Sequence, residues 1–95
     1  MRTALRRRVG EWDTFTGTFC QWGFRDERVL VRDVVASDGT KVTDHIWLWG
    51  RSFRRFVLNP GDRIRFKAQV IIYAKGRDRC LDYGLGKPAR CEVIE

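Results

Sequence analysis

The chain is rich in aromatic and arginine side chains and poor in the groups that catalysis uses. Its 95 residues include twelve aromatics and fifteen arginines but a single histidine, His45. Acid–base or nucleophilic catalysis needs a base with a nucleophile or a second titratable group in reach, and the sequence suggests no such set around His45. Isolated acids at turns, such as Asp33 and Asp62, are more typical of caps than of cation ligands. We therefore expect no enzymatic activity, no metal site and no cofactor.

The cysteines, Cys20, Cys80 and Cys91, are odd in number and form no C-x-x-C pair. This spacing favours neither a disulfide framework nor a zinc site. Because a free cysteine packs as a small hydrophobic side chain, we expect buried or half-buried thiols in a reducing compartment.

The net charge is +7 and the isoelectric point is near 10.0. Arginine heads form forked contacts with phosphates and stack on rings, so this charge favours a polyanionic partner over a merely solvated surface. The longest apolar run, residues 70–74, is too short to span a bilayer. The arginine-rich first eight residues lack the apolar stretch of a signal peptide. These features predict a cytoplasmic protein with no membrane partner.

The length allows one domain. Residues 1–10 are arginine-rich and unperiodic, which predicts a flexible or loosely docked basic arm before a domain of residues 11–95. Strand patterns cover residues 12–24, 29–36, 41–49, 63–73 and 89–94. The first changes phase near Gly17, which predicts a bulge. On the fourth, strict alternation directs inward the residues Ile64, Phe66, Ala68, Val70 and Ile72.

Asp38-Gly39 predicts a hairpin between the second and third strands. A two-residue turn would place Arg32 opposite His45 and Asp33 opposite Asp44, and facing like charges cost stability. A three-residue turn with a left-handed glycine would instead place Arg32 opposite Asp44. Charge favours the second register, but the sequence leaves both open.

The remaining segments complete the predicted fold. Residues 52–58 suggest a short helix, with Ser52 as its N-cap and Phe53, Phe56 and Val57 at helical spacing. Residues 59–62 predict a turn, and residues 74–88 a loop. Five strands, a long bent first strand and a short helical plug between the third and fourth predict an all-β, five-stranded OB-fold barrel. An SH3-like barrel is the nearest alternative.

Three segments also carry a family resemblance. They are FTGTF at residues 15–19, VTDHIWL at 42–48 and PGDRIRFKAQV at 60–70, followed by the pattern Asp82-Tyr83-x-Leu85-x-x-Pro88. On these segments the chain resembles a group of small OB-fold proteins of phages and mobile genetic elements. The resemblance implies the OB fold and a single-stranded-DNA-binding module. The chain departs from the group in its arginine-rich arm and in Trp49.

Exposed aromatics interleaved with cations are typical of surfaces that bind single-stranded nucleic acid, because bases stack on rings regardless of sequence. Trp47 and Trp49 share a face opposite Ile46 and Leu48 in either hairpin register. The predicted nucleic-acid-binding residues are Trp22, Phe24, Arg28, His45, Trp47, Trp49, Arg63, Arg65, Lys67, Tyr73, Lys75 and Arg77.

The sequence thus predicts sequence-tolerant binding of single-stranded DNA, or of single-stranded RNA as a variant. The alternative is a protein–protein interaction module, for instance a phage-encoded inhibitor or an assembly or homo-oligomer subunit, that uses the same aromatic face. Salt dependence separates the two, since phosphate contacts weaken steeply with salt and an aromatic protein interface does so far less.

Overall fold

The computed structural model describes residues 3–23, 27–75 and 80–94. Their elements are two 3-10 helices, η1 (Thr3–Arg8) and η2 (Arg51–Phe53), and five strands, β1 (Trp12–Trp22), β2 (Arg28–Val35), β3 (Lys41–Trp49), β4 (Arg63–Lys75) and β5 (Cys80–Val93). The predicted all-β class and the five strands are confirmed. No helix in the described ranges is long and apolar enough to cross a membrane.

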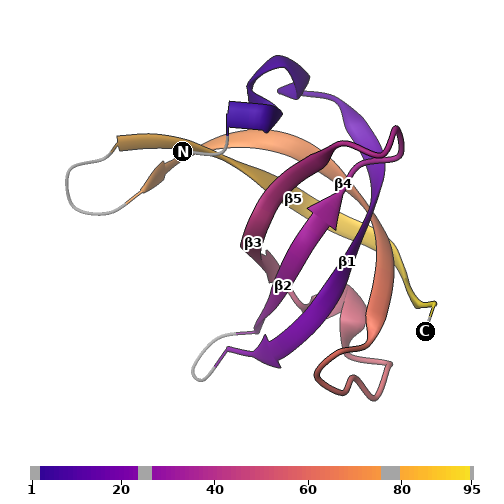
Figure 1. Ribbon diagram of the computed structural model, residues 1–95. Helices are drawn as coiled ribbons and strands as arrows, with labels where there is room; N and C mark the ends of the chain where they lie inside the picture. The colour runs from indigo at the N-terminus through magenta and orange to yellow at the C-terminus, as the bar shows by residue number, and fades with distance from the viewer. Residues whose placement is uncertain (1–2, 24–26, 76–79, 95) are drawn as a thin grey trace.

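The strands form one antiparallel sheet in the order β3-β2-β1-β4-β5 (Figure 1). Three hairpin-connected strands followed by a fourth that returns beside the first is the Greek-key order. The sheet curls so that its edge strands β3 and β5 approach and contact each other. No ladder between the described residues of these two strands closes the sheet.

The core lies inside the curl of the sheet. Phe66 of β4 stacks on Phe15 of β1, with ring centroids 5.9 Å apart, and meets the edge of Phe53 of η2 at 6.0 Å. The inward alternation of β4 is confirmed from Ile64 to Val70. It is wrong for Ile72, which is 48% exposed. Ile72 pairs with Tyr83 in the part of the β4–β5 hairpin that extends beyond the curl (Figure 1).

The predicted bulge in β1 is confirmed. The ladder between β1 and β2 shifts register between Thr16 and Thr18, on either side of Gly17. A Cβ atom on Gly17 would lie 2.5 Å from Val31 Cγ1. Glycine at this position therefore lets β1 bend while its backbone packs directly against β2.

The hairpin between β2 and β3 has a three-residue turn. The Ala36 N–H donates to the Thr40 carbonyl oxygen at 2.9 Å, and Gly39 is left-handed with a φ of +88°. Next to the turn, Val35 pairs with Lys41. The favoured turn type is therefore confirmed.

The register expected from that turn is nevertheless wrong. A bulge at the next step of the ladder shifts it by one residue, so that Arg32 pairs with His45 and not with Asp44. The repulsion between Asp33 and Asp44 that argued against this register is offset by a lysine. Lys41 Nζ lies 3.3 Å from Asp33 Oδ1 and 2.7 Å from Asp44 Oδ1.

The helical plug is shorter than predicted. It is one 3-10 turn that follows Gly50, and Ser52 lies inside it and does not cap it. The Ser52 hydroxyl instead donates to the Pro88 carbonyl oxygen at 2.8 Å, which ties η2 to β5. Phe53 is buried as predicted, but Val57 is 88% exposed because the helix ends before it.

The turn at residues 59–62 is confirmed. The Asp62 N–H donates to the Asn59 carbonyl oxygen at 3.0 Å, and Gly61 has a φ of +96°. The loop predicted at residues 74–88 is wrong, because β5 already begins at Cys80. Pro88 lies on an edge strand in a bulge of the ladder, where a missing N–H is tolerated.

The basic N-terminal segment is packed against the domain more firmly than the sequence predicts. Leu5 of η1 is fully buried within the core, and η1 contacts β3 and β5. Arg8 Nη2 lies 2.6 Å from Asp38 Oδ2. This hydrogen bond with Arg8 lowers the pKa of Asp38 to about 2.

The three thiols lie in different environments. Cys91 is buried, and burial raises its pKa to about 12. Cys20 is half-buried. Cys80 is exposed, so the expectation of a buried or half-buried thiol is wrong there. It lies within residues 74–88, where a loop is predicted, and is the first residue of β5.

We expect a thiol reagent at pH 8 to modify Cys80 first and Cys91 last in the native protein. With a pKa near 12, about one Cys91 thiol in 10⁴ is a thiolate at that pH, and burial restricts access further. Cys91 should react at least about a hundredfold more slowly than Cys80, and Cys80→Ser should abolish the fast phase. Equal rates, or a mass two hydrogens lower without reductant, would contradict this assignment.

Candidate functional site

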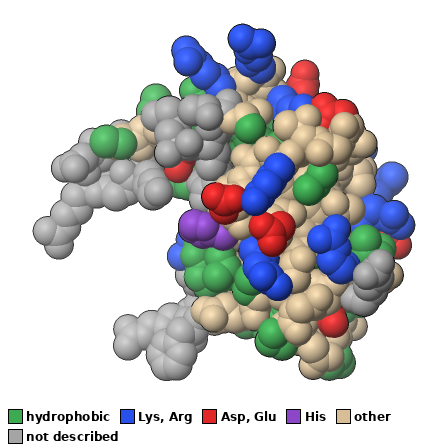
Figure 2. Space-filling view, in the orientation of Figure 1, with side chains coloured by type: hydrophobic (Ala, Val, Ile, Leu, Met, Phe, Trp, Pro, Cys, Tyr) green, Lys and Arg blue, Asp and Glu red, His purple; other side chains and the backbone are tan. Residues whose placement is uncertain are grey.

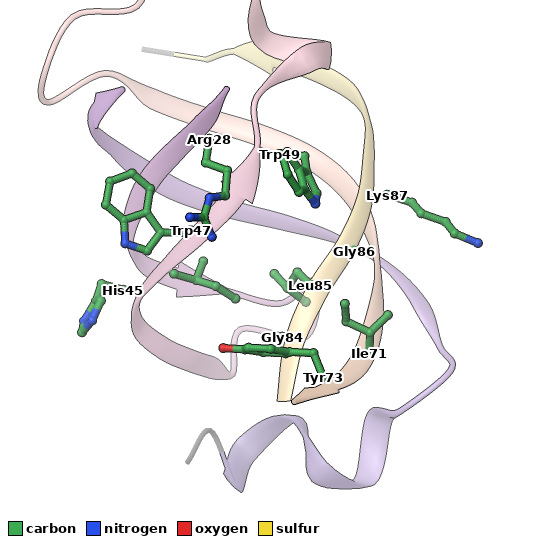
Figure 3. Close-up of a pocket in the computed structure, with 11 residues that line it drawn as sticks. Arg28, His45, Trp47, Trp49, Ile71, Tyr73, Gly84, Leu85, Gly86 and Lys87 are labelled. Carbon is green, nitrogen blue, oxygen red and sulfur yellow. The ribbon is translucent and has the colours of Figure 1, made fainter. Parts of the chain in front are cut away.

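A groove of about 710 Å³ lies between the outer face of β3 and the β4–β5 hairpin. Figure 2 shows the molecule hollowed on its left side, next to the histidine side chain. Arg28 of β2 and His45, Trp47 and Trp49 of β3 lie on one side, with Ile71 and Tyr73 of β4 on the other (Figure 3). We call this hollow, with Gly84–Lys87 of β5 as its floor, the aromatic groove.

The floor is flat because two residues of β5 have no side chain. A Cβ atom on Gly84 would lie 2.9 Å from Tyr73 Cε1, and one on Gly86 would lie 3.1 Å from Ile71 Cδ1. The Tyr73 and Ile71 side chains occupy the space that the two glycines leave, and Figure 3 shows the Tyr73 ring lying across Gly84. The two glycines thus position an aromatic ring beside the floor.

The opposite wall is the outer face of β3. Trp47 is 39% exposed and Trp49 is 60% exposed, whereas Ile46 and Leu48 between them are buried in the core. The predicted division of β3 into an apolar inner face and an aromatic outer face is therefore confirmed. Two indole rings and one phenol ring line a single groove.

Cations flank these rings. The Arg28 guanidinium lies 5.9 Å from the centroid of the Trp49 ring, a cation–π contact across the β2–β3 ladder. Arg32, on the same strand, pairs with His45. Lys87 lies at the far rim, where its side chain points away from the tryptophans (Figure 3). Arg28 therefore lies directly beside the rings, and Lys87 adds a positive charge at the outer rim.

Three other predicted cations lie outside the groove. Arg63, Arg65 and Lys67 alternate along the start of β4, beside β1. Arg65 Nε lies 2.7 Å from Glu92 Oε1, and Arg63 Nη1 donates to Thr18 Oγ1 at 3.4 Å. The structure thus pairs Arg65 with a carboxylate and does not bring this row to the aromatic rings.

Trp22 is also separate from the groove. Its ring meets Phe19 edge-on, with centroids 6.3 Å apart, and a Cβ atom on Gly50 would overlap it. Among the other predicted residues, Phe24, Arg77 and the side chain of Lys75 lie outside the described part of the structure.

Sequence reasoning missed Ile71 and the glycine floor. The signal was the spacing of Gly84 and Gly86, because glycines two apart on a strand leave one face bare. This spacing predicts a bare face next to Ile71 and Tyr73 only when the register that pairs Gly84 with Ile71 is known. Trp12 was also not identified from the sequence as an exposed aromatic side chain. It is 47% exposed on β1, but it does not line the groove.

The described residues form no group of three or more His, Cys, Asp or Glu side chains that could hold a metal ion. The groove can stack planar groups and attract anions. No family model, curated protein or solved structure matches the chain. The function of the groove is therefore inferred from its geometry.

Proposed function

We propose that the chain is an OB-fold barrel that binds single-stranded nucleic acid and catalyses no reaction. The Greek-key order supports the fold, since the OB-fold is a five-stranded, partly open Greek-key barrel. The contacts between β3 and β5 support it further, because an OB-fold barrel brings its two edge strands next to each other.

The observation that carries the function is the set of ring faces in the aromatic groove. Trp47 and Trp49 are partly exposed on one wall, and Tyr73 lies across the glycine floor on the other. Stacking of a base on such a ring contributes about 1–3 kcal/mol and tolerates any sequence. The groove therefore suits a strand whose bases are unpaired and splayed.

The charge of the groove suits the backbone of the same strand. Arg28 and Lys87 lie on opposite sides of the rings, in a chain of net charge +7. Each phosphate that they neutralise releases condensed counterions, which makes binding salt-dependent. We propose single-stranded DNA as the preferred ligand, with RNA as the variant to compare.

Titration of the tryptophan fluorescence with oligo-dT at about 50 and 200 mM salt tests this function. If about three phosphates are contacted, the dissociation constant should rise roughly 10- to 20-fold between these salt concentrations. Oligo-dA should bind within about tenfold of oligo-dT, because stacking is sequence-tolerant. Oligo-U under the same conditions measures the preference between DNA and RNA.

Two results would contradict the proposal. One is the absence of a fluorescence change with any oligonucleotide. The other is binding whose strength does not vary with salt. Either would favour the alternative, in which the exposed aromatics form an interface with another protein.

A further inference from the structure

A second basic site lies where the chain leaves β3. Arg51, Arg54 and Arg55, in and after η2, and Arg90 of β5 line a depression of about 400 Å³, which we call the arginine pocket. All four side chains are exposed. None of the four is among the nucleic-acid-binding residues predicted from the sequence.

Contacts between η2 and β5 hold this pocket together. The Ser52 hydroxyl bonds the Pro88 carbonyl oxygen, and Arg55 Nη2 donates to the Cys91 carbonyl oxygen at 3.5 Å. The Arg55 guanidinium also lies 5.0 Å from the centroid of the Phe56 ring. These contacts orient the Arg55 head group before any ligand arrives, which lowers the entropy lost on binding.

The positive charge of the pocket is only partly neutralised. Arg54 forms an ion pair with Glu27. Within the described residues, Arg51 and Arg90 form no ion pair. Like charges gathered on one surface repel each other, and an anion with several acceptor oxygens would relieve that repulsion.

The backbone conformation of Arg90 is a second, independent feature of this pocket. Its φ is +50°, in the left-handed region that favours glycine, and it lies at a bulge in the ladder between β4 and β5. Lys87, at the rim of the aromatic groove, has a φ of +53°. Non-glycine residues in this region are uncommon, and of the three among the described residues, Lys87 and Arg90 border the two sites whereas Asp33 borders neither.

The arginine pocket continues the aromatic groove. Along β5, Lys87 borders the groove and Arg90 borders the pocket. Along the other edge, Trp49 borders the groove and Arg51 borders the pocket. Two residues of chain therefore separate the two sites along β5, and one residue, Gly50, separates them on the other side.

We propose that the arginine pocket binds backbone phosphates of the same single strand, next to the bases stacked in the aromatic groove. This inference rests on the proposed function and extends it, because it makes the binding site longer than the groove. A strand that fills only the groove would not reach Arg51 and Arg90, whereas a longer strand would contact both.

The test is the salt dependence of binding for Arg51→Gln/Arg90→Gln with oligo-dT of about 4 and about 16 nucleotides. Each phosphate contact on a single strand contributes about 0.7 to the slope of log K against log salt. For the long strand we expect the slope of the double variant to be smaller than that of the wild type by about 1.4. For the short strand the slopes should agree.

The matched control is Arg6→Gln/Arg7→Gln, which removes the same charge from two exposed arginines of η1. Its slope with the long strand should stay close to that of the wild type. Arg90→Gly is a second variant, because a φ of +50° suits glycine. It should lower the slope by about 0.7 without lowering the melting temperature.

The outcomes distinguish this inference from the proposed function. If the wild type binds neither strand, the proposed function fails. If the wild type binds but the double variant keeps its slope with the long strand, only the arginine pocket is excluded. The arginine pocket is also excluded if the double variant lowers the salt slope equally for the long and the short strand, or if the η1 control lowers it as much as the double variant does. The same double variant is also titrated with an oligo-glutamate peptide. If it loses affinity for this peptide but keeps the wild-type salt slope with oligo-dT, the arginine pocket binds an acidic protein instead.

Discussion

Trp47→Ala is expected to weaken oligo-dT binding by about 1–3 kcal/mol, or roughly 5- to 150-fold, and to leave the fold intact. Trp47 projects from the outer face of β3 and is 39% exposed, while the neighbouring Ile46 and Leu48 are buried. The substitution therefore removes a stacking surface and little of the core. The salt slope should hardly change, because no phosphate contact is lost.

Binding curves and thermal melts of the same samples measure both effects. Trp12→Ala is the matched control, since Trp12 is 47% exposed on β1 but lies outside the groove. It should bind as the wild type does. If Trp47→Ala melts normally and binds oligo-dT as tightly as the wild type, the aromatic groove is not the binding surface. A loss of about 3–5 kcal/mol in stability would instead make Trp47 a core residue.

Leu5→Ala is expected to destabilise the protein by about 2–5 kcal/mol, although Leu5 lies in the arginine-rich N-terminal segment. Its side chain is fully buried between η1 and the strands that η1 contacts, so truncation leaves a cavity. The free energy of unfolding of a domain this small is only about 5–15 kcal/mol. A loss of this size should therefore lower the melting temperature by many degrees.

Chemical denaturation of the variant and the wild type gives the free energy of unfolding directly. Val57→Ala serves as the control, since Val57 is 88% exposed and its truncation should change the stability by less than about 0.5 kcal/mol. A Leu5→Ala protein as stable as the wild type would show that the N-terminal segment is dispensable for folding.

The strands and their faces were largely predictable. The bounds of β3 and the inward positions of β4 up to Val70 follow from period-two alternation, which is a local property of the chain. The same alternation placed Trp47 and Trp49 together on one face. The bulge at Gly17 and the turn at residues 59–62 followed from the backbone freedom of glycine and the fixed φ of proline.

Predictions failed where local chemistry and tertiary contact disagree. Gly84, Gly86 and Pro88 indicate a loop by composition, yet they lie in β5 because the ladder with β4 pairs them or bulges around them. The register predicted for Arg32 was wrong because a bulge between Val34 and Val35 shifts the ladder by one residue, and Lys41 offsets the repulsion between the two aspartates. The first effect depends on the pairing of β4 with β5, and the second depends on a bulge inside a hairpin whose strands were predicted to pair.

The sequence by itself determined the first four strands, the face of β3 that carries the indole rings and the positive charge of the surface. All three depend on residue type and on short-range alternation. Only the tertiary structure decided that Tyr73 lies across Gly84 and that Arg90 joins Arg51. These residues are far apart in the chain or on different strands. What joins them is the register of β5, which depends on bulges at Lys87 and Arg90 where no glycine marks the left-handed backbone.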